Sequence, residues 1–140
     1  ALTLGGNKAK QQPFTPPPFD AAAVSGTPEL ADDLGYSELD AKSFKLSVCG
    51  KLMEQNGTVD VYLTNPAENE VWLKVRITDE HDKILGESGL IKPGEYVRSV
   101  SISDIPANGA VKLKIMAYEP DTYYSAGTAT LNTAIREVDS

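Results

Sequence analysis

The chain has 140 residues, a formal net charge of −7 and a single cysteine. This length fits one domain with a tail, which can bury a core without a metal or a disulfide bond. Acidic residues outnumber basic ones by 20 to 13, which argues against a nucleic-acid-binding protein because affinity for phosphates rests on clustered Lys and Arg. Cys49 has no partner for an intramolecular disulfide or a Cys-based zinc site, so we expect it to be a small buried apolar residue.

Residues 1–42 form a leader that contains five of the nine prolines. Phe14 and Phe19 flank the run Pro16-Pro17-Pro18. Pro-rich sequence is extended and semi-rigid, so the leader is interpreted as a stalk or as a strap laid on the domain. The two aromatics are also consistent with a polyproline ligand for a partner groove.

A short helix is predicted over residues 27–34. Thr27-Pro28 is typical of a helix start, and Gly35 is typical of a helix end. Leu30, Leu34 and Leu39 would then share an apolar side that docks on the domain.

From residue 44 the hydrophobic period changes to two, which indicates strands. The runs 44–48 and 59–63 flank Asn56-Gly57, a tight-turn signal that predicts a hairpin. Pro66 ends the second strand because proline cannot donate to the ladder.

Further strands are predicted over residues 71–77, 84–87, 96–102, 111–117 and 125–133. The residues expected to face the core in three of these strands are Val71, Leu73, Val75 and Ile77, then Val111, Leu113, Ile115 and Ala117, then Ala129 and Leu131. Seven short strands with turns at regular spacing predict an all-β fold, a seven-stranded antiparallel immunoglobulin-like β-sandwich. The domain is placed at residues 43–135, with a tail at 136–140.

Three segments carry a resemblance to a known class of proteins: LTNPAENEVWLKVRI at 63–77, ILGESG at 84–89 and IKPGEY at 91–96. Residues 44–133 resemble immunoglobulin-like or fibronectin-III-like domains of uncharacterised membrane-anchored or lipoprotein-type surface proteins of Gram-positive bacteria. The resemblance implies an extracytoplasmic β-sandwich without an established activity, so no catalytic residues are carried over.

The residues that could support catalysis or metal binding are few. His81 is the sole histidine and lies in a charged predicted turn with Asp79, Glu80 and Asp82. The acids of this turn could hold Ca²⁺, but their spacing fits no EF-hand loop. Because hydrolase, P-loop and dinucleotide signatures are also absent, we expect no enzyme, no cofactor and no metal.

A basic and aromatic strip is the first candidate binding surface. Alternation places Trp72, Lys74 and Arg76 on the face of their strand opposite the core, and pairing with the strand at 111–117 would add Lys112, Lys114 and Tyr118. Such a strip could stack on sugar rings or receive an acidic partner. Alternatively, the leader covers Trp72, and lysine stems lie over its ring.

A second candidate is the tyrosine cluster formed by Tyr118, Tyr123 and Tyr124 in the connection between the last two strands. Loops at the end of a sandwich commonly carry recognition, and tyrosine suits binding. Structural tyrosines at such corners are the alternative.

Together these observations favour a non-enzymatic structural or protein-interaction module at a bacterial cell surface, outside the cytoplasm. A carbohydrate-binding module is the first alternative, and an inhibitor or accessory partner of a secreted enzyme is the second. The expected partner is a protein or a cell-surface polymer and not a nucleic acid. No run reaches the ~20 apolar residues of a membrane span, so membrane attachment would need an anchor preceding Ala1, which the absence of an initial Met leads us to expect.

Overall fold

A computed structural model describes residues 17–29, 35–41 and 44–137. These residues form strands and no helix, which confirms the prediction of an all-β fold. The strands are β1 (Val24–Ser25), β2 (Tyr36–Asp40), β3 (Lys45–Cys49), β4 (Leu52–Gln55), β5 (Thr58–Asn65), β6 (Trp72–Thr78), β7 (Ile84–Glu87), β8 (Glu95–Ser101), β9 (Ala110–Tyr118) and β10 (Ser125–Glu137).

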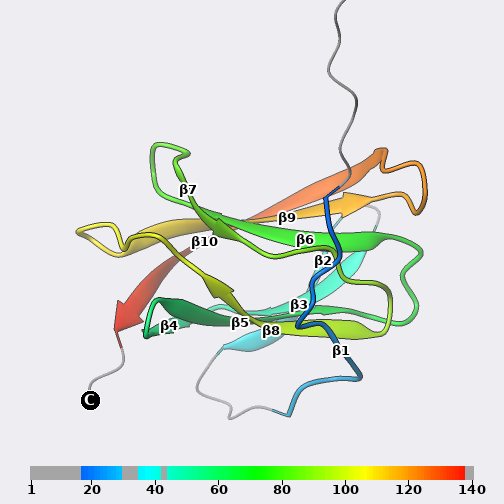
Figure 1. Ribbon diagram of the computed structural model, residues 1–140, viewed down its shortest axis with the longest axis horizontal. Helices are drawn as coiled ribbons and strands as arrows, with labels where there is room; N and C mark the ends of the chain where they lie inside the picture. The colour runs from blue at the N-terminus through cyan, green and yellow to red at the C-terminus, as the bar shows by residue number, and fades with distance from the viewer. Residues whose placement is uncertain (1–16, 30–34, 42–43, 138–140) are drawn as a thin grey trace, which may run out of the picture.

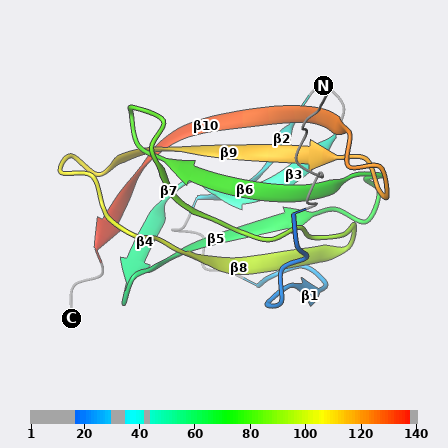
Figure 2. The same cartoon turned by 45° about the horizontal axis from the view of Figure 1, so that its top comes forward.

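The strands form two layers that belong to one curled sheet (Figures 1 and 2). One layer contains β10, β9, β6 and β7, which are antiparallel neighbours in that order. The other contains β1, β8 and β5, with β4 and β3 paired to β5 and β2 paired to β3. The layers are joined by β10, whose final residues pair in parallel with β4 and place Ile135 opposite Leu52.

The structure corrects the predicted count of seven strands to ten within the described residues. β1 and β2 come from the leader, and the break at Gly50 and Lys51 separates β4 from β3. Consequently, the Asn56-Gly57 turn joins β4 to β5 and not the first predicted strand to the second. Asn56 and Gly57 have φ of 56° and 81°, the left-handed pair that a type I′ hairpin turn requires.

The predicted helix is not found in its described part. Residues 27–29 are not helical, and residues 30–34 lie outside the described residues. Leu39, which was expected to dock with that helix, lies in β2, whose five residues pair with β3. The leader therefore contributes two strands to the sheet, and its described segments lie along the domain (Figure 1).

The core lies between the two layers and follows the predicted alternation. In β6 and β9, Leu73, Val75, Ile77, Leu113 and Ile115 are fully buried, because every second residue of a strand points to the same face. Cys49 has no exposed surface, as expected. Val71 is only half-buried, while Ala129 and Leu131 pack against the core from β10.

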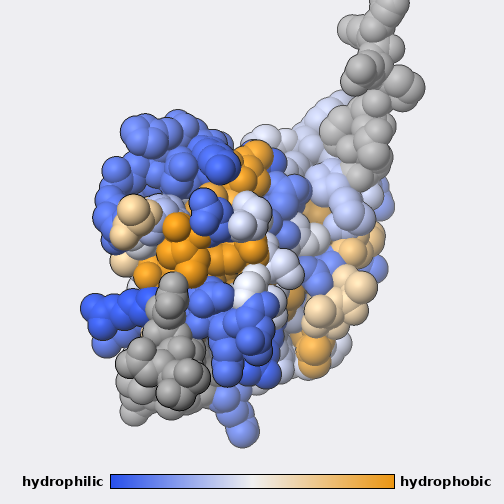
Figure 3. All heavy atoms as spheres, turned by 60° about the vertical axis from the view of Figure 1, so that its left-hand side comes forward, coloured by the Kyte–Doolittle hydropathy of each residue, from blue (hydrophilic) through white to orange (hydrophobic). Residues whose placement is uncertain are grey.

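One end of the molecule carries the β6–β7 turn and the β8–β9 connection (Figure 1). Viewed from this side, hydrophobic surface lies between hydrophilic surface (Figure 3). Ile102 and Ile105 in the β8–β9 connection are half-buried and pack against the core. The described part of the chain contains no helix with the length and apolarity needed to span a bilayer.

Candidate functional site

The candidate site is the outer face of the layer formed by β7, β6, β9 and β10. The register of β6 with β9 pairs Trp72 with Tyr118, Lys74 with Met116, Arg76 with Lys114 and Thr78 with Lys112. Directly opposed residues of an antiparallel pair share a face. The tertiary structure thus brings together the six strip residues, with an aromatic end at Trp72 and a basic end at Lys112.

The aromatic end is partly covered by the leader. The Phe19 ring meets Trp72 edge-on, with ring centroids 4.8 Å apart, and Tyr123 meets the same ring at 5.6 Å. The Lys92 ammonium lies 4.8 Å from the Phe19 centroid. Trp72 is consequently half-buried. Among the described residues, the lysine at this end, Lys92, lies over the Phe19 ring and not over Trp72.

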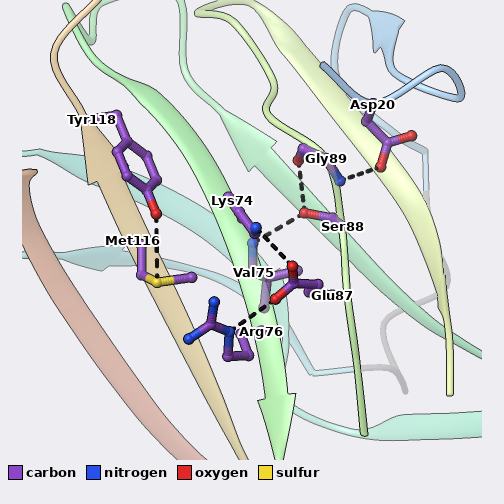
Figure 4. Close-up of polar contacts among 9 residues, drawn as sticks. All are labelled: Asp20, Lys74, Val75, Arg76, Glu87, Ser88, Gly89, Met116 and Tyr118. Atoms are coloured by element: carbon purple, nitrogen blue, oxygen red, sulfur yellow. Dashed lines mark hydrogen bonds and ion pairs between the residues drawn. The ribbon is translucent and has the colours of Figure 1, made fainter. Parts of the chain in front are cut away.

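The three tyrosines of the predicted cluster, Tyr118, Tyr123 and Tyr124, differ in their surroundings. The Tyr118 hydroxyl donates to the Met116 sulfur at 3.8 Å (Figure 4). Tyr124 lies in the β9–β10 connection with 68% of its surface exposed. The predicted tyrosine cluster therefore splits, because Tyr123 packs on Trp72 and Tyr124 points to solvent.

The middle of the face is an ion-pair triad around Glu87. Lys74 Nζ donates to Glu87 Oε1 at 2.8 Å, and Arg76 Nε donates to Oε2 at 2.9 Å (Figure 4). The Lys74 side chain is only 8% exposed. Burial acts to raise the pKa of Glu87, but the hydrogen bonds and charges of Lys74 and Arg76 outweigh it and hold that pKa below its usual range. Lys74 is therefore a structural cation and is not available to a partner.

The basic end surrounds a hollow of about 330 Å³. Lys112 Nζ approaches Asp82 Oδ1 at 3.4 Å, and Arg76 uses Nε for Glu87. Within residues 17–29, 35–41 and 44–137, Lys114 has no ion-pair or hydrogen-bond partner and is exposed. The lining residues are Arg76, Thr78, Asp82, Ile84, Lys112, Lys114 and Thr130.

Glu87, Asp82 and Thr130 also belong to this site, although sequence reasoning missed them. Glu87 lies in a strand that was predicted, and its pairing with β6 places it opposite Arg76. Thr130 pairs with Lys114. A charge complementary to Arg76 in the following strand was the only signal that could have indicated Glu87.

The turn around His81 is organised by Asp79 and is exposed. The Asp79 carboxylate accepts hydrogen bonds from the backbone N–H groups of Lys83 and His81 at 2.9 and 2.8 Å, and the Lys83 bond is the main reason that its pKa is lowered. The acids of this turn act separately, since Glu80 accepts from Asn108 and Asp82 faces Lys112. The described residues contain no group of three or more His, Cys, Asp or Glu arranged to hold a metal ion.

The opposite layer carries an aromatic pair that sequence reasoning missed. Tyr62 has a φ of 47° at an irregularity in the pairing of β5 with β8, a conformation that is rare outside glycine. Its ring stacks with Tyr96 at 6.4 Å, and Arg98 lies over it at 5.8 Å. The Tyr62 ring thus has two neighbours within the chain, Tyr96 and Arg98.

Comparisons with known proteins give little. No protein-family model matches the chain, and no curated protein sequence matches it. Among solved structures, the crystal structure of CopC from Methylosinus trichosporium OB3b is similar at 13% sequence identity and a TM-score of 0.41, over 75% of this chain and 97% of that chain.

Proposed function

We propose that this chain is a non-enzymatic interaction module that binds an acidic partner on the outer face of β7, β6, β9 and β10. The observation that carries the proposal is the hollow between Arg76, Lys112 and Lys114 on a protein whose net charge is −7. An acidic protein repels anionic partners over most of its surface. A local group of cations therefore selects both the face and the orientation of binding.

The charges of the hollow are available to a ligand to different degrees. The Lys114 ammonium is unpaired within the described residues, and Lys112 shares a 3.4 Å contact with the exposed Asp82. The Arg76 contact with Glu87 uses Nε, so the terminal nitrogens remain for a carboxylate or phosphate. Thr78 and Thr130 also line this hollow, and a threonine hydroxyl is able to donate a hydrogen bond to an anion.

The aromatic end favours an acidic partner over a neutral sugar. Stacking of a sugar requires an open ring face, whereas Trp72 is half-buried between Phe19 and Tyr123. A carbohydrate-binding module remains the alternative that the experiment must separate. An inhibitor or accessory role toward a secreted enzyme is a special case in which the acidic partner is that enzyme.

We further propose that β3 and β5–β10, which correspond to the seven predicted strands, form an immunoglobulin-like core to which β1, β2 and β4 are added. The resemblance of residues 44–133 to bacterial surface domains supports placing the module outside the cytoplasm at a cell surface.

A labelled decamer of glutamate tests the charged face in the full chain. Fluorescence anisotropy should show binding that weakens as salt rises. Lys114→Gln and Lys112→Gln should each weaken binding about threefold to tenfold, as expected for loss of one partly exposed charge contact of ~1 kcal/mol. Lys51→Gln, a change at an exposed lysine outside the hollow, is the matched control and should have no effect.

Two outcomes would contradict the proposal. The first is a lysine control that weakens binding as much as the variants of the hollow. The second is binding of a neutral oligosaccharide that resists salt and is lost in Trp72→Ala, which would favour the carbohydrate-binding alternative.

A further inference from the structure

The leader forms a parallel β-bridge with the segment that directly follows β7. Pro18-Phe19-Asp20 runs parallel to the edge at residues 88–90, with Phe19 opposite Leu90. The Leu90 N–H donates to the Pro18 carbonyl at 2.8 Å, and the Asp20 N–H donates to the Leu90 carbonyl at 2.9 Å. This is strand addition to a sheet edge, in which backbone bonds supply affinity and side-chain contacts supply specificity.

Two side chains of this segment, those of Phe19 and Asp20, make specific contacts with the domain. The Phe19 ring lies against Trp72 at 4.8 Å and beneath the Lys92 ammonium at 4.8 Å. The Asp20 carboxylate accepts a hydrogen bond from the Gly89 N–H at 2.9 Å (Figure 4). A hydrophobic ring followed by an acid is therefore the chemistry that this edge selects.

Gly89 lets the added backbone approach closely. A Cβ at this position would lie 2.5 Å from the Asp20 nitrogen and 2.8 Å from the Phe19 carbonyl carbon. Both are backbone atoms that cannot move aside without breaking the two hydrogen bonds to Leu90. Alanine at residue 89 should consequently exclude the added strand.

We propose that residues 88–90, Trp72 and Lys92 form a peptide-recognition site for an extended segment with an aromatic residue followed by an acid. Its occupant in trans is the Pro18-Phe19-Asp20 segment of a second copy of this chain, which replaces the segment bound in cis. The site is distinct from the cationic hollow and does not depend on the function proposed for it.

Three features of the segment support exchange between copies. Every copy carries the same segment, and its prolines pre-extend the backbone and reduce the entropy lost on binding. Phe19 remains 44% exposed in cis, so its ring is only partly enclosed by this chain. The cis segment competes at an effective concentration in the millimolar range, so exchange should emerge where copies are crowded or where the cis contact is weakened.

Two full-length variants make the exchange measurable. The acceptor is Phe19→Ala/Asp20→Ala, in which the cis segment loses both recognised side chains and the site stays intact. The donor is Gly89→Ala/Trp72→Phe, which keeps the segment but has lost its own site. Because Trp72 is the only tryptophan, fluorescence of the mixture reports the acceptor site alone.

Addition of donor to acceptor should shift the tryptophan emission to shorter wavelength in a saturable way and give a heterodimer by light scattering, while each variant alone stays monomeric. A donor that also carries Phe19→Ala/Asp20→Ala is the matched control and should produce neither change. A peptide of residues 17–22 should reproduce the shift, and the same peptide with alanine for Phe19 should not. This peptide arm tests the site even if the donor fails to fold.

The proposal would be overturned if the tryptophan emission of the folded acceptor did not shift with a folded donor, or did not shift with the peptide at millimolar concentration. An equal shift with the control donor or the alanine peptide would also overturn it. If the acceptor were unfolded in thermal melts, the single variant Phe19→Ala, which removes the ring that contacts Trp72 and Lys92, would serve as acceptor, and the same outcomes would apply.

Discussion

At the scale of single residues, Cys49 shows how burial controls reactivity. The side chain has no exposed surface, and its removal from water, with a smaller contribution from Asp60, raises the pKa of the thiol to about 11. The thiolate is the reactive form of cysteine. A buried thiol with a raised pKa is therefore protected from reaction in two ways: reagents cannot reach it, and it stays protonated.

We expect Cys49 in the folded chain to resist a thiol reagent such as dithionitrobenzoate at pH 8 and to react fully in denaturant. The measurement is the absorbance released with time, with and without guanidinium. Free glutathione under both conditions is the control for the reagent. Rapid stoichiometric reaction of the native chain would show that the residue is accessible.

Trp72 is the second residue whose surroundings yield a prediction. Trp72→Ala should cost about 2 kcal/mol, less than the ~3–5 kcal/mol typical of a fully buried aromatic. A double-mutant cycle with Phe19→Ala should give a coupling of about 0.5–1.5 kcal/mol for the edge-on ring contact. Urea unfolding measures both, and the exposed Tyr124→Ala should change stability by less than about 0.5 kcal/mol. A coupling of zero would show that Phe19 does not cover the indole.

At the scale of elements, Asn65 ties the end of β5 to two other segments. Its side-chain amide donates to the carbonyls of Val71 and Ile91 at 2.8 and 3.1 Å, and its Oδ1 accepts from Asn69 at 2.8 Å. Asn65 is fully buried. Asn65→Ala should cost about 2–4 kcal/mol in urea unfolding, because buried carbonyls lose their donor, whereas the exposed Asn132→Ala in β10 should change little.

The contact between β6 and β7 predicts a pH dependence. The pKa of Glu87 in the folded chain lies below its ordinary value of 4.5. The ionised Glu87 carboxylate therefore stabilises the folded state fully above pH 4.5, and this stabilisation is lost as the pH falls through the pKa of Glu87 in the folded chain. Melting temperatures at pH 7 and pH 3 should differ less in Glu87→Gln than in the wild-type chain. Glu119→Gln, at an exposed residue outside the triad, is the control, and an unchanged difference in Glu87→Gln would contradict the prediction.

At the scale of the whole molecule, the two layers are connected through the last residues of β10. Ile135 is buried, pairs with Leu52 of the opposite layer and donates its N–H to the Gly109 carbonyl at 2.8 Å. Ile135→Ala should cost about 2–4 kcal/mol, because it removes core contacts at this connection. Denaturant unfolding measures this, with the exposed Arg136→Ala as control. A cost below about 1 kcal/mol would show that the connection contributes little.

The sequence by itself determined the inward and outward faces of β6 and β9 and the turn at Asn56-Gly57. Side-chain direction in a strand alternates locally, and that turn needs two neighbouring residues with positive φ. The same alternation places Trp72, Lys74 and Arg76 on one face. The predicted strands at 71–77 and 111–117 therefore yielded most of the candidate site.

Only the tertiary structure decided which side chains are free. It placed Glu87 between Lys74 and Arg76, left Lys114 without a partner among the described residues, and laid Phe19 on Trp72. It also joined the end of β10 to β4. Each of these contacts joins residues from different segments of the chain. A periodic pattern determines the face that a side chain occupies, but strand order and register determine what it meets there.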